Sequence, residues 1–375
     1  MIYLDNAATS FPKSEVVYQE MDRVNRTLSV NSGRGSYKAA KDASSIISTT
    51  REKLLELFNA KNIANVIFTP SITHALNQVI YGLNPKDNSV IYITPYEHNA
   101  VARCVELLRQ KTGFIVKLIP LKDDYQIDLD KMQYEFSIDP PSMLIMNAIS
   151  NVTGYVLPVE QMSKMAKQFN GTVVIDTAQA AGLINIDMEE LQADVICFAG
   201  HKSLGGPFGI GGFLLRDGIE LVQQFAGGTG SDSLNLNMPK AIPDRYEASS
   251  PNIVAIAGLL AALKEIDIQK HHDKIESLTQ YAKTQIQSLP NVKIVGSTPQ
   301  QLGIVSFILQ GYNSNDVGDI LDNEFNIAVR TGYHCCPYIH SILKDEPYGG
   351  TVRLGLGPYN SENDIDALYE SLKTL

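Results

Sequence analysis

Short apolar segments alternate with helical patterns from about residue 15 to residue 230, and this alternation constrains the fold more than any other feature of the chain. It is typical of a mostly parallel sheet covered by helices. We expect strands at residues 65–68, 89–93, 115–120, 142–146, 172–175, 194–198 and 212–215. Open α/β sheets bind ligands beyond the carboxyl ends of their strands, so the residues that follow these segments are the first candidates for a site.

The pattern changes after about residue 252. Residues 253–263 are apolar but too few for the ~18–20 residues of a membrane span, so they predict a buried helix. We then expect strands at 292–295, 303–309 and 351–356, a helix from Ser314, a loop at 331–348, and a final helix that Ser361 and Asp364 cap. This order predicts a large α/β domain over residues 15–252 and a smaller α+β domain formed by residues 253–375 with residues 1–14.

Composition narrows the range of partners. The 375 residues carry a formal net charge of −10, which argues against nucleic acid and against anionic membrane surfaces. The first residues lack the basic start and apolar run of a signal peptide, so we expect a cytoplasmic protein. Four cysteines in so long a chain make no disulfide framework, and the patterns around Cys104 and Cys197 are typical of a core.

A lysine follows one of the expected buried strands. Residues 195–199 are apolar, Gly200-His201-Lys202 comes next, and a glycine-rich loop leads into the following strand. Beside an apolar strand a lysine loses solvation, so its free amine becomes able to form a Schiff base; a lysine that caps a surface turn is the alternative. The loop does not fit a Walker motif, because His201 stands where glycine is needed, nor a dinucleotide fingerprint, because it opens a strand and not a helix.

Four further strand ends carry polar groups, and of these the turn at residues 147–154 has little specificity of its own. Ser71 and Thr73 precede a helical pattern, where they could cradle a phosphate or cap the helix. His98 could stack on a planar ligand or shuttle protons, or be a structural histidine. Asp176 ends an apolar strand, so its carboxylate needs a cationic partner, which could be a protonated heteroaromatic nitrogen or an ordinary salt bridge.

Taken together, these strand ends match the needs of pyridoxal 5'-phosphate (PLP). A lysine forms the imine with the cofactor aldehyde, an aspartate keeps the ring nitrogen protonated, and a phosphate site anchors the molecule. In a parallel sheet the carboxyl ends of the strands meet at one edge, so all these groups would face one ligand.

The chain resembles the class V aminotransferase fold, which implies an α/β, PLP-dependent transferase-like protein of fold type I, and within it the cysteine desulfurases of the group that includes selenocysteine lyases. The matching motifs run in the family's order along nearly the whole chain. They are Tyr3-Leu4-Asp5-Asn6-Ala7-Ala8-Thr9, Glu97-His98, Ser150-Asn151-Val152-Thr153-Gly154, Asp176-Thr177-Ala178-Gln179, Gly200-His201-Lys202, Arg245-Tyr246-Glu247-Ala248, Arg330-Thr331-Gly332-Tyr333-His334-Cys335 and Val352-Arg353.

The resemblance implies that Lys202 binds the cofactor covalently, Asp176 pairs with its ring nitrogen and Gln179 hydrogen-bonds its phenolic oxygen. It also implies that His98 stacks on the ring. The phosphate would be held by Thr73 and His201 together with Ser250 from the second subunit of a homodimer. Asn151 and Arg353 would bind the substrate carboxylate, and Cys335 would be the nucleophile that takes the sulfur.

Some positions depart from the family. Ala199 stands where a serine is frequent, which removes one phosphate-binding hydroxyl. Ser250 stands where a threonine is common, which is a mild change, and Ile72 stands where a second small hydroxylated residue is usual. Cys335 is followed by Cys336, which leaves open which thiol carries sulfur. Arg330 and His334 give Cys335 a cationic setting that would lower its pKa. A zinc site formed by His334, Cys335, Cys336 and His340 is an alternative, although its spacing is not that of a familiar zinc module.

The expected activity is conversion of L-cysteine to L-alanine, with the sulfur left on Cys335 as a persulfide and passed to a protein acceptor. Proton transfer is assigned to Lys202 and His98. A selenocysteine lyase, a cysteine β-lyase or an aminotransferase on the same scaffold is the nearest alternative. A sulfur carrier or scaffold protein with a decayed cofactor site is an alternative of another class.

Overall fold

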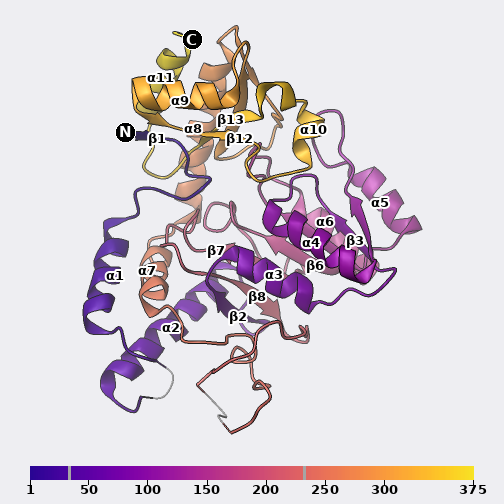
Figure 1. The fold of residues 1–375 in the computed structure, drawn as a ribbon, viewed down its shortest axis with the longest axis vertical. Helices are drawn as coiled ribbons and strands as arrows, with labels where there is room; N and C mark the ends of the chain where they lie inside the picture. The colour runs from indigo at the N-terminus through magenta and orange to yellow at the C-terminus, as the bar shows by residue number, and fades with distance from the viewer. Residues whose placement is uncertain (33–34, 231–233) are drawn as a thin grey trace.

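The computed structural model describes residues 1–32, 35–230 and 234–375. Its main sheet has seven strands in the order β2-β8-β7-β6-β5-β3-β4. Figure 1 labels β2, β8, β7, β6 and β3 of this sheet. β8 is antiparallel to β2 and β7, and all other neighbouring strands of this sheet are parallel, so the prediction of a mostly parallel sheet is confirmed. The strands are β2 (Ala64–Thr69), β3 (Val90–Ile93), β4 (Ile115–Leu118), β5 (Met143–Asn147), β6 (Thr172–Asp176), β7 (Val195–Ala199) and β8 (Gly211–Arg216).

Helices cover both faces of this sheet because its strands are apolar on both sides. Val174 belongs to the apolar cluster that holds α3 (Ile72–Gly82) and α4 (Asn99–Thr112) against one face. Val173 and Ile175 belong to the cluster on the other face, which includes residues of three further helices of this region. Those helices are α2 (Lys38–Leu57), α5 (Leu129–Ile138) and α6 (Val159–Gln168). Successive residues of a strand point to opposite faces, and this explains why the strands read as continuous apolar runs.

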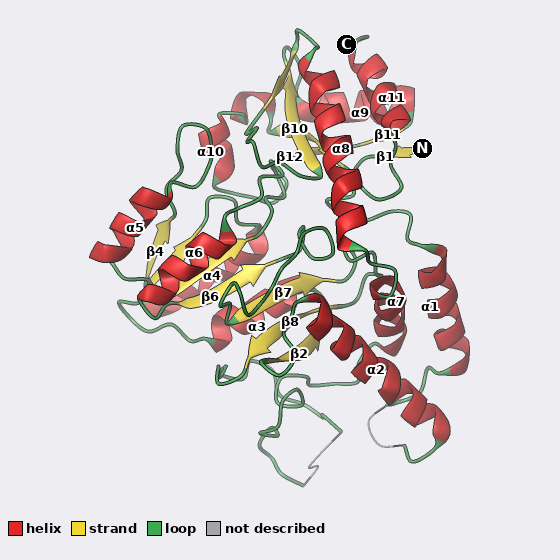
Figure 2. Ribbon diagram, turned by 180° about the vertical axis from the view of Figure 1, so that it is seen from behind, coloured by secondary structure: helices red, strands yellow, loops and turns green. Residues whose placement is uncertain are grey.

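The helix predicted at residues 253–263 is α7 (Ile253–Leu263), and most of its residues are buried. It packs against α1 (Glu15–Thr27) and α2. The next helix, α8 (Ile268–Gln287), leads to the C-terminal part of the chain (Figure 2). Among the described residues, no helix combines the length and apolar character needed to cross a membrane.

The C-terminal part contains an antiparallel sheet in the order β12-β13-β10-β9. Its strands are β9 (Val292–Ile294), β10 (Ile304–Leu309), β12 (Arg330–Gly332) and β13 (Thr351–Gly355), and its helices include α9 (Ser314–Phe325) and α11 (Glu362–Leu372). The first residues join this part, because β1 (Ile2–Tyr3) pairs in parallel with β11 (Ile327–Ala328). The domain boundaries at residues 14/15 and 252/253 stay predictions.

The loop expected at residues 331–348 is partly wrong. Its first residues belong to β12, residues 339–343 form α10 (Ile339–Leu343), and a 3-10 turn covers Glu346–Tyr348. The helix buries Ile339, His340 and Leu343. A helix of five residues is too short to show a period in the sequence, so only packing reveals it. At α11 the capping prediction is confirmed, since the carboxylate of Asp364 accepts the backbone N–H of Ser361 at 3.0 Å.

Candidate active site

A cavity of about 240 Å³ opens at the carboxyl ends of the central strands. It is lined by all but one of the residues that the sequence assigns to a site: Thr73, His98, Asn151, Asp176, Gln179, His201, Lys202, Cys335 and Arg353. These residues come from the ends of β5, β6 and β7, from the starts of α3 and α4, and from the C-terminal part. The cavity therefore depends on the contact between the two parts of the chain.

Lys202 and Asp176 follow adjacent parallel strands, which brings them to one wall of the cavity. Asp176 is the last residue of β6 and pairs with Cys197 of β7. Lys202 follows Cys197 by five positions in the chain. Burial lowers the pKa of Lys202, and the nearby carboxylate of Asp176 opposes that shift. Burial raises the pKa of Asp176, while the N–H of Ala178, which donates to its Oδ1 at 2.8 Å, and the charge of Lys202 favour the ionised form. The amine thus loses protonation more readily than an exposed lysine does.

His98 combines a structural role with a position at the cavity. It is the N-cap of α4, where its Nδ1 accepts the N–H of Ala100 at 3.0 Å, and it also lines the cavity. Burial lowers its pKa to about 4, assisted by the charges of Lys202 and Arg353. His98 is therefore neutral at pH 7, and because Nδ1 is an acceptor, its hydrogen sits on Nε2.

The helix start at α3 has its N-cap beside the cavity. Ser71 is the N-cap, and its hydroxyl accepts the N–H of His74 at 3.3 Å. Thr73 lies in the first turn of the helix and lines the cavity. Nearby His201 stacks on Phe208 with ring centres 4.5 Å apart, and its buried Nδ1 has no hydrogen-bond partner among the described residues. Hydroxyls at a helix start beside an unpaired polar atom suit an anionic group.

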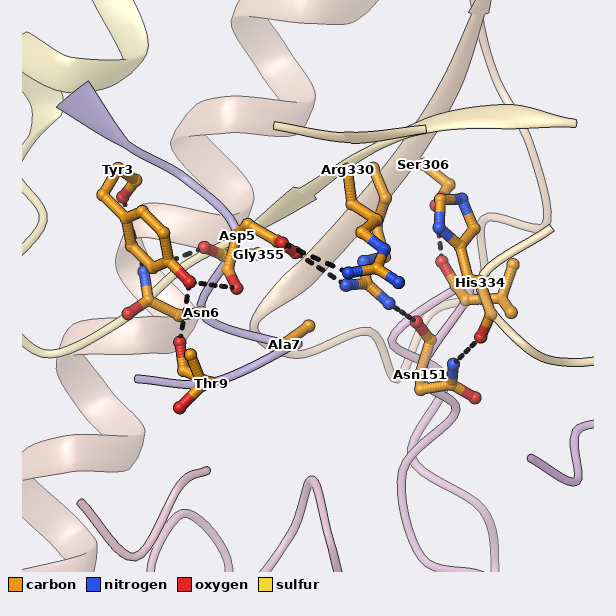
Figure 3. Close-up of polar contacts among 12 residues, drawn as sticks. Tyr3, Asp5, Asn6, Ala7, Thr9, Asn151, Ser306, Arg330, His334 and Gly355 are labelled. Carbon is orange, nitrogen blue, oxygen red and sulfur yellow. Dashed lines mark hydrogen bonds and ion pairs between the residues drawn. The ribbon is translucent and has the colours of Figure 1, made fainter. Parts of the chain in front are cut away.

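Arg353 enters the cavity from β13 in a fixed orientation. One guanidinium nitrogen donates to Oδ1 of Asp5 at 2.8 Å, and another donates to the carbonyl oxygen of Asn151 at 2.9 Å. The amide of Asn151 in turn donates to the carbonyl of His334 at 2.7 Å (Figure 3). Nε of Arg353 and Oδ1 of Asn151 are buried and find no partner within the described part of the chain. These two unpaired groups are free for a bound molecule.

The two adjacent cysteines have different surroundings. Cys335 is exposed and lines the cavity, whereas Cys336 is 1% exposed and its Sγ lies 3.6 Å from the carbonyl oxygen of Pro95. Burial raises the pKa of the Cys336 thiol, and the carboxylate of Glu97 adds to this effect. Since thiolate is the reactive form, Cys335 is the thiol that can react from this loop.

The zinc alternative does not fit this loop. Both ring nitrogens of His340 lie within hydrogen-bond distance of other groups, the carboxyl of Asp345 and the carbonyl of Tyr333. In residues 1–32, 35–230 and 234–375, no three histidine, cysteine, aspartate or glutamate side chains group closely enough to hold a metal ion.

The sequence profile of the family "Aminotransferase class-V" matches residues 2–368. The chain belongs to the class V aminotransferase family. It is 32% identical to a "Probable cysteine desulfurase" of Streptomyces coelicolor, over 100% of this chain and 91% of the relative, and 30% identical to a "Cysteine desulfurase" of Serratia proteamaculans, over 100% and 93%.

Solved structures agree with this class V assignment. The apo cysteine desulfurase of Thermococcus onnurineus NA1 superimposes with a TM-score of 0.89 at 28% identity, covering 100% of this chain and 95% of that one. The Escherichia coli cysteine desulfurase CsdA superimposes with a TM-score of 0.85 at 25% identity, covering 100% and 94%. The expected PLP fold type I is confirmed.

Ser250 is the predicted site residue that this class V chain does not bring to the cavity. It is exposed, and its hydroxyl accepts the side-chain amide of Asn31 at 3.3 Å in a separate hollow that Arg51 and Glu247 also line. The sequence analysis assigns Ser250 to the site of a second subunit, so its role stays a prediction.

The sequence analysis gives no role to Asp5 or Glu97, and it uses Arg330 only as a positive charge near Cys335. Asp5 fixes Arg353, Arg330 lies 3.9 Å from Asp5 and lines the cavity, and Glu97 is fully buried behind His98. All three lie within the sequence motifs that this chain shares with the family, and their place in those motifs was the signal that could have identified them. Their partners lie far away in sequence, so their roles could not be assigned from the motifs alone.

Proposed function

We propose that this protein is a PLP-dependent cysteine desulfurase that converts L-cysteine to L-alanine and leaves the sulfur on Cys335. The observation that carries the proposal is that Lys202, Asp176 and Cys335 line one cavity. The names of the relatives from Streptomyces and Serratia support the activity.

The residues of the cavity fit PLP. A buried carboxylate at Asp176 suits the protonated ring nitrogen, and the amine of Lys202 suits the aldehyde. Thr73, at the start of α3, and His201 would hold the phosphate, His98 would stack on the ring, and Gln179 would reach the phenolic oxygen. When bound, PLP supplies a ring that withdraws electrons from the substrate Cα.

The protein's own groups then bind and deprotonate the substrate. Arg353 and Asn151 would hold the carboxylate of cysteine through the atoms that have no partner in the described chain, Nε and Oδ1. Nε of Arg353 can donate to the carboxylate directly, whereas Oδ1 of Asn151 only accepts and would reach it through a bridging water that donates to both oxygens. Lys202, whose pKa burial lowers, would take the Cα proton as a free amine. His98 is neutral and carries its hydrogen on Nε2, so it can donate a hydrogen bond to the substrate sulfur.

Sulfur transfer would follow at Cys335. Its thiolate attacks the sulfur of the bound cysteine, an S–S bond forms, and the C–S bond of the substrate breaks. The electron pair of that bond stays with the substrate carbon, which gains a proton and leaves as alanine. The protein keeps the sulfur as a persulfide on Cys335, and an acceptor thiol removes it. No external oxidant is needed, because the substrate carbon is reduced as its sulfur is oxidised.

Alanine and sulfide formation from L-cysteine and L-selenocysteine tests this proposal with Cys335→Ser and its matched control Cys336→Ser. We expect Cys335→Ser to lose sulfide release from cysteine and Cys336→Ser to retain most of it, because Cys336 is buried. Sulfide release by Cys335→Ser at the parent rate, or pyruvate in place of alanine, would contradict the proposal. Selenocysteine activity that survives in Cys335→Ser while cysteine activity is lost would favour the selenocysteine lyase alternative.

The proposal also covers the oligomeric state, the cellular compartment and the sulfur acceptor. We expect a cytoplasmic homodimer in which Ser250 of each subunit reaches the phosphate site of the other, and a protein thiol as sulfur acceptor. The exposed position of Ser250, away from the cavity of its own chain, is compatible with that arrangement. The division into domains at residues 14/15 and 252/253 belongs to the same expectation.

A further inference from the structure

His340 and Asp345 form a buried pair of side chains next to the loop that carries Cys335. The proposed chemistry does not use this pair. His340 belongs to α10 and Asp345 follows that helix, with side chains that are 5% and 0% exposed. Nδ1 of His340 is 2.7 Å from Oδ2 of Asp345, and Nε2 is 2.9 Å from the carbonyl oxygen of Tyr333. The pair therefore connects the end of α10 to the residue two positions before Cys335.

The partners of the ring decide where its hydrogens are. A carbonyl oxygen only accepts, so Nε2 of His340 carries a hydrogen and donates it to Tyr333. At Nδ1, either the ring donates to an ionised Asp345 or a protonated Asp345 donates to the ring, and the hydrogen bond exists in both cases. The other carboxyl oxygen of Asp345 has no partner in the described part of the chain, so this carboxyl depends on His340. Bonds at both nitrogens fix the ring.

The carbonyl oxygen of Tyr333, which His340 contacts, also accepts the hydrogen bond that closes the turn at residues 333–336. The N–H of Cys336 donates to the same carbonyl oxygen of Tyr333 at 3.0 Å. Between them His334 and Cys335 have φ values of 47° and 56°, both left-handed. A left-handed conformation costs a non-glycine residue about 1–2 kcal/mol, and such strain persists only where the surroundings impose it.

This turn is the element that separates the two thiols. It presents Cys335 to the cavity and to solvent while Cys336 stays buried against Pro95. If the turn relaxed into ordinary conformations, Cys335 would leave the position in which it lines the cavity with Lys202 and Arg353. A displacement of about 1 Å in a reacting group is enough to slow a reaction about a hundredfold.

We propose that the His340–Asp345 pair is a positioning unit for the nucleophile: it holds the carbonyl of Tyr333, and with it the left-handed turn that keeps Cys335 at the cavity. This inference rests on the proposed function of Cys335. Neither side chain reaches the cavity, so the pair acts through the backbone.

Three variants test the pair. His340→Leu removes the ring but leaves Asp345 buried without a partner, which can prevent folding. The double variant His340→Leu/Asp345→Leu removes both polar groups and avoids that penalty, because two apolar side chains can replace a buried pair at little cost. Asp345→Asn keeps a group that can hydrogen-bond to Nδ1. The matched control is His272→Leu, a surface histidine 3.9 Å from Glu276.

We expect the double variant to bind PLP, to lose about tenfold or more in kcat, and to keep KM for cysteine within about twofold, because the substrate site is unchanged. Hydrogen exchange at the Cys336 amide should quicken about tenfold, while that of β6 and β7 stays at the parent rate. Asp345→Asn should keep kcat within about threefold, since the bonds to the ring survive. His272→Leu should match the parent in both measurements.

A double variant that folds and keeps the parent kcat would overturn the inference, and so would a parent rate of exchange at the Cys336 amide. The exchange measurement does not depend on catalysis. If Cys335→Ser showed that sulfur is not carried by Cys335, the proposed function would fail, and the exchange rate would still decide whether the pair holds the turn.

Discussion

The side chains of Arg353 and Asp5 form an ion pair of 2.8 Å although 348 positions separate them in the chain. Asp5 follows β1 and Arg353 lies in β13. The arginine side chain is 3% exposed and the aspartate 15%, so the guanidinium is largely withdrawn from water and depends on this partner. The pair fixes one edge of the proposed substrate site.

Asp5→Ala should therefore affect stability and substrate binding together. Removing one member of a mostly buried pair leaves the other charge without compensation, and we expect the free energy of unfolding to fall by about 3 kcal/mol. The loosened guanidinium should raise KM for cysteine about tenfold, with a smaller change in kcat. Urea unfolding and steady-state kinetics measure both. The control Asp22→Ala breaks the exposed pair with Arg26 and should leave both unchanged; an equal effect of the two variants would contradict the role of Asp5.

Lys202→Ala should abolish covalent attachment of the cofactor. In the parent, borohydride reduction should fix a pyridoxyl group on one peptide containing residue 202, because a free amine there meets the aldehyde. The variant should bind PLP at most reversibly and yield no labelled peptide by mass spectrometry. Lys164→Ala, which changes an exposed lysine paired with Glu160, should behave as the parent. A fixed pyridoxyl group elsewhere in the Lys202→Ala chain would assign the linkage to another residue.

Alkylation should distinguish the two adjacent thiols. Of the four cysteines, Cys335 is exposed and the other three are buried, so brief iodoacetamide treatment of the folded protein should modify Cys335 and no other. After denaturation all four should react. Cys335→Ser should remain unlabelled under native conditions, and Cys336→Ser should label as the parent does. Labelling of Cys336 in the folded protein would show that the turn opens.

Glu97→Gln should alter how stability depends on pH. Glu97 is fully buried, and burial raises its pKa to about 8 from an ordinary value of 4.5. Between these two values the folded state binds a proton that the unfolded state releases, so Glu97 makes the protein less stable as pH rises from about 4.5 through about 8. Glutamine has no proton to lose, and it can still accept the hydrogen bonds from Thr94 and from the N–H of Asn147, at 2.6 and 2.9 Å.

The urea midpoint of Glu97→Gln relative to the parent should therefore rise steadily between pH 5 and pH 8. The exposed Glu52→Gln serves as control and should give a constant difference over that range. A constant difference for Glu97→Gln as well would show that Glu97 is ionised in the folded protein.

The strand ends are the part of the site that the sequence could identify. Asp176 and Lys202 each follow an apolar run, and parallel strands bring their carboxyl ends to one edge, so two local patterns were enough to place them at one ligand. The helix of residues 253–263 was equally predictable, because an apolar run of that length has few other solutions.

The nucleophile loop shows where such reasoning fails. A loop was expected at residues 331–348, yet α10 lies inside it and carries His340 against Asp345. A short helix has no measurable period, and a buried histidine looks the same in sequence as an exposed one. The sequence left two thiols as candidates, and burial of Cys336 separated them.

The sequence by itself determined the alternation of helices and strands, the edge of the sheet at which the site lies, and the residue types that suit PLP, because hydrophobic periodicity and strand ends are local properties. Only the tertiary structure decided that Asp5 meets Arg353, that Cys335 and not Cys336 lines the cavity, and that His340 contacts the carbonyl oxygen of Tyr333. Those relationships join segments that are distant in the chain or conformations that packing imposes. The free energy that selects them comes from burial and from partners supplied by other elements, which no stretch of sequence contains.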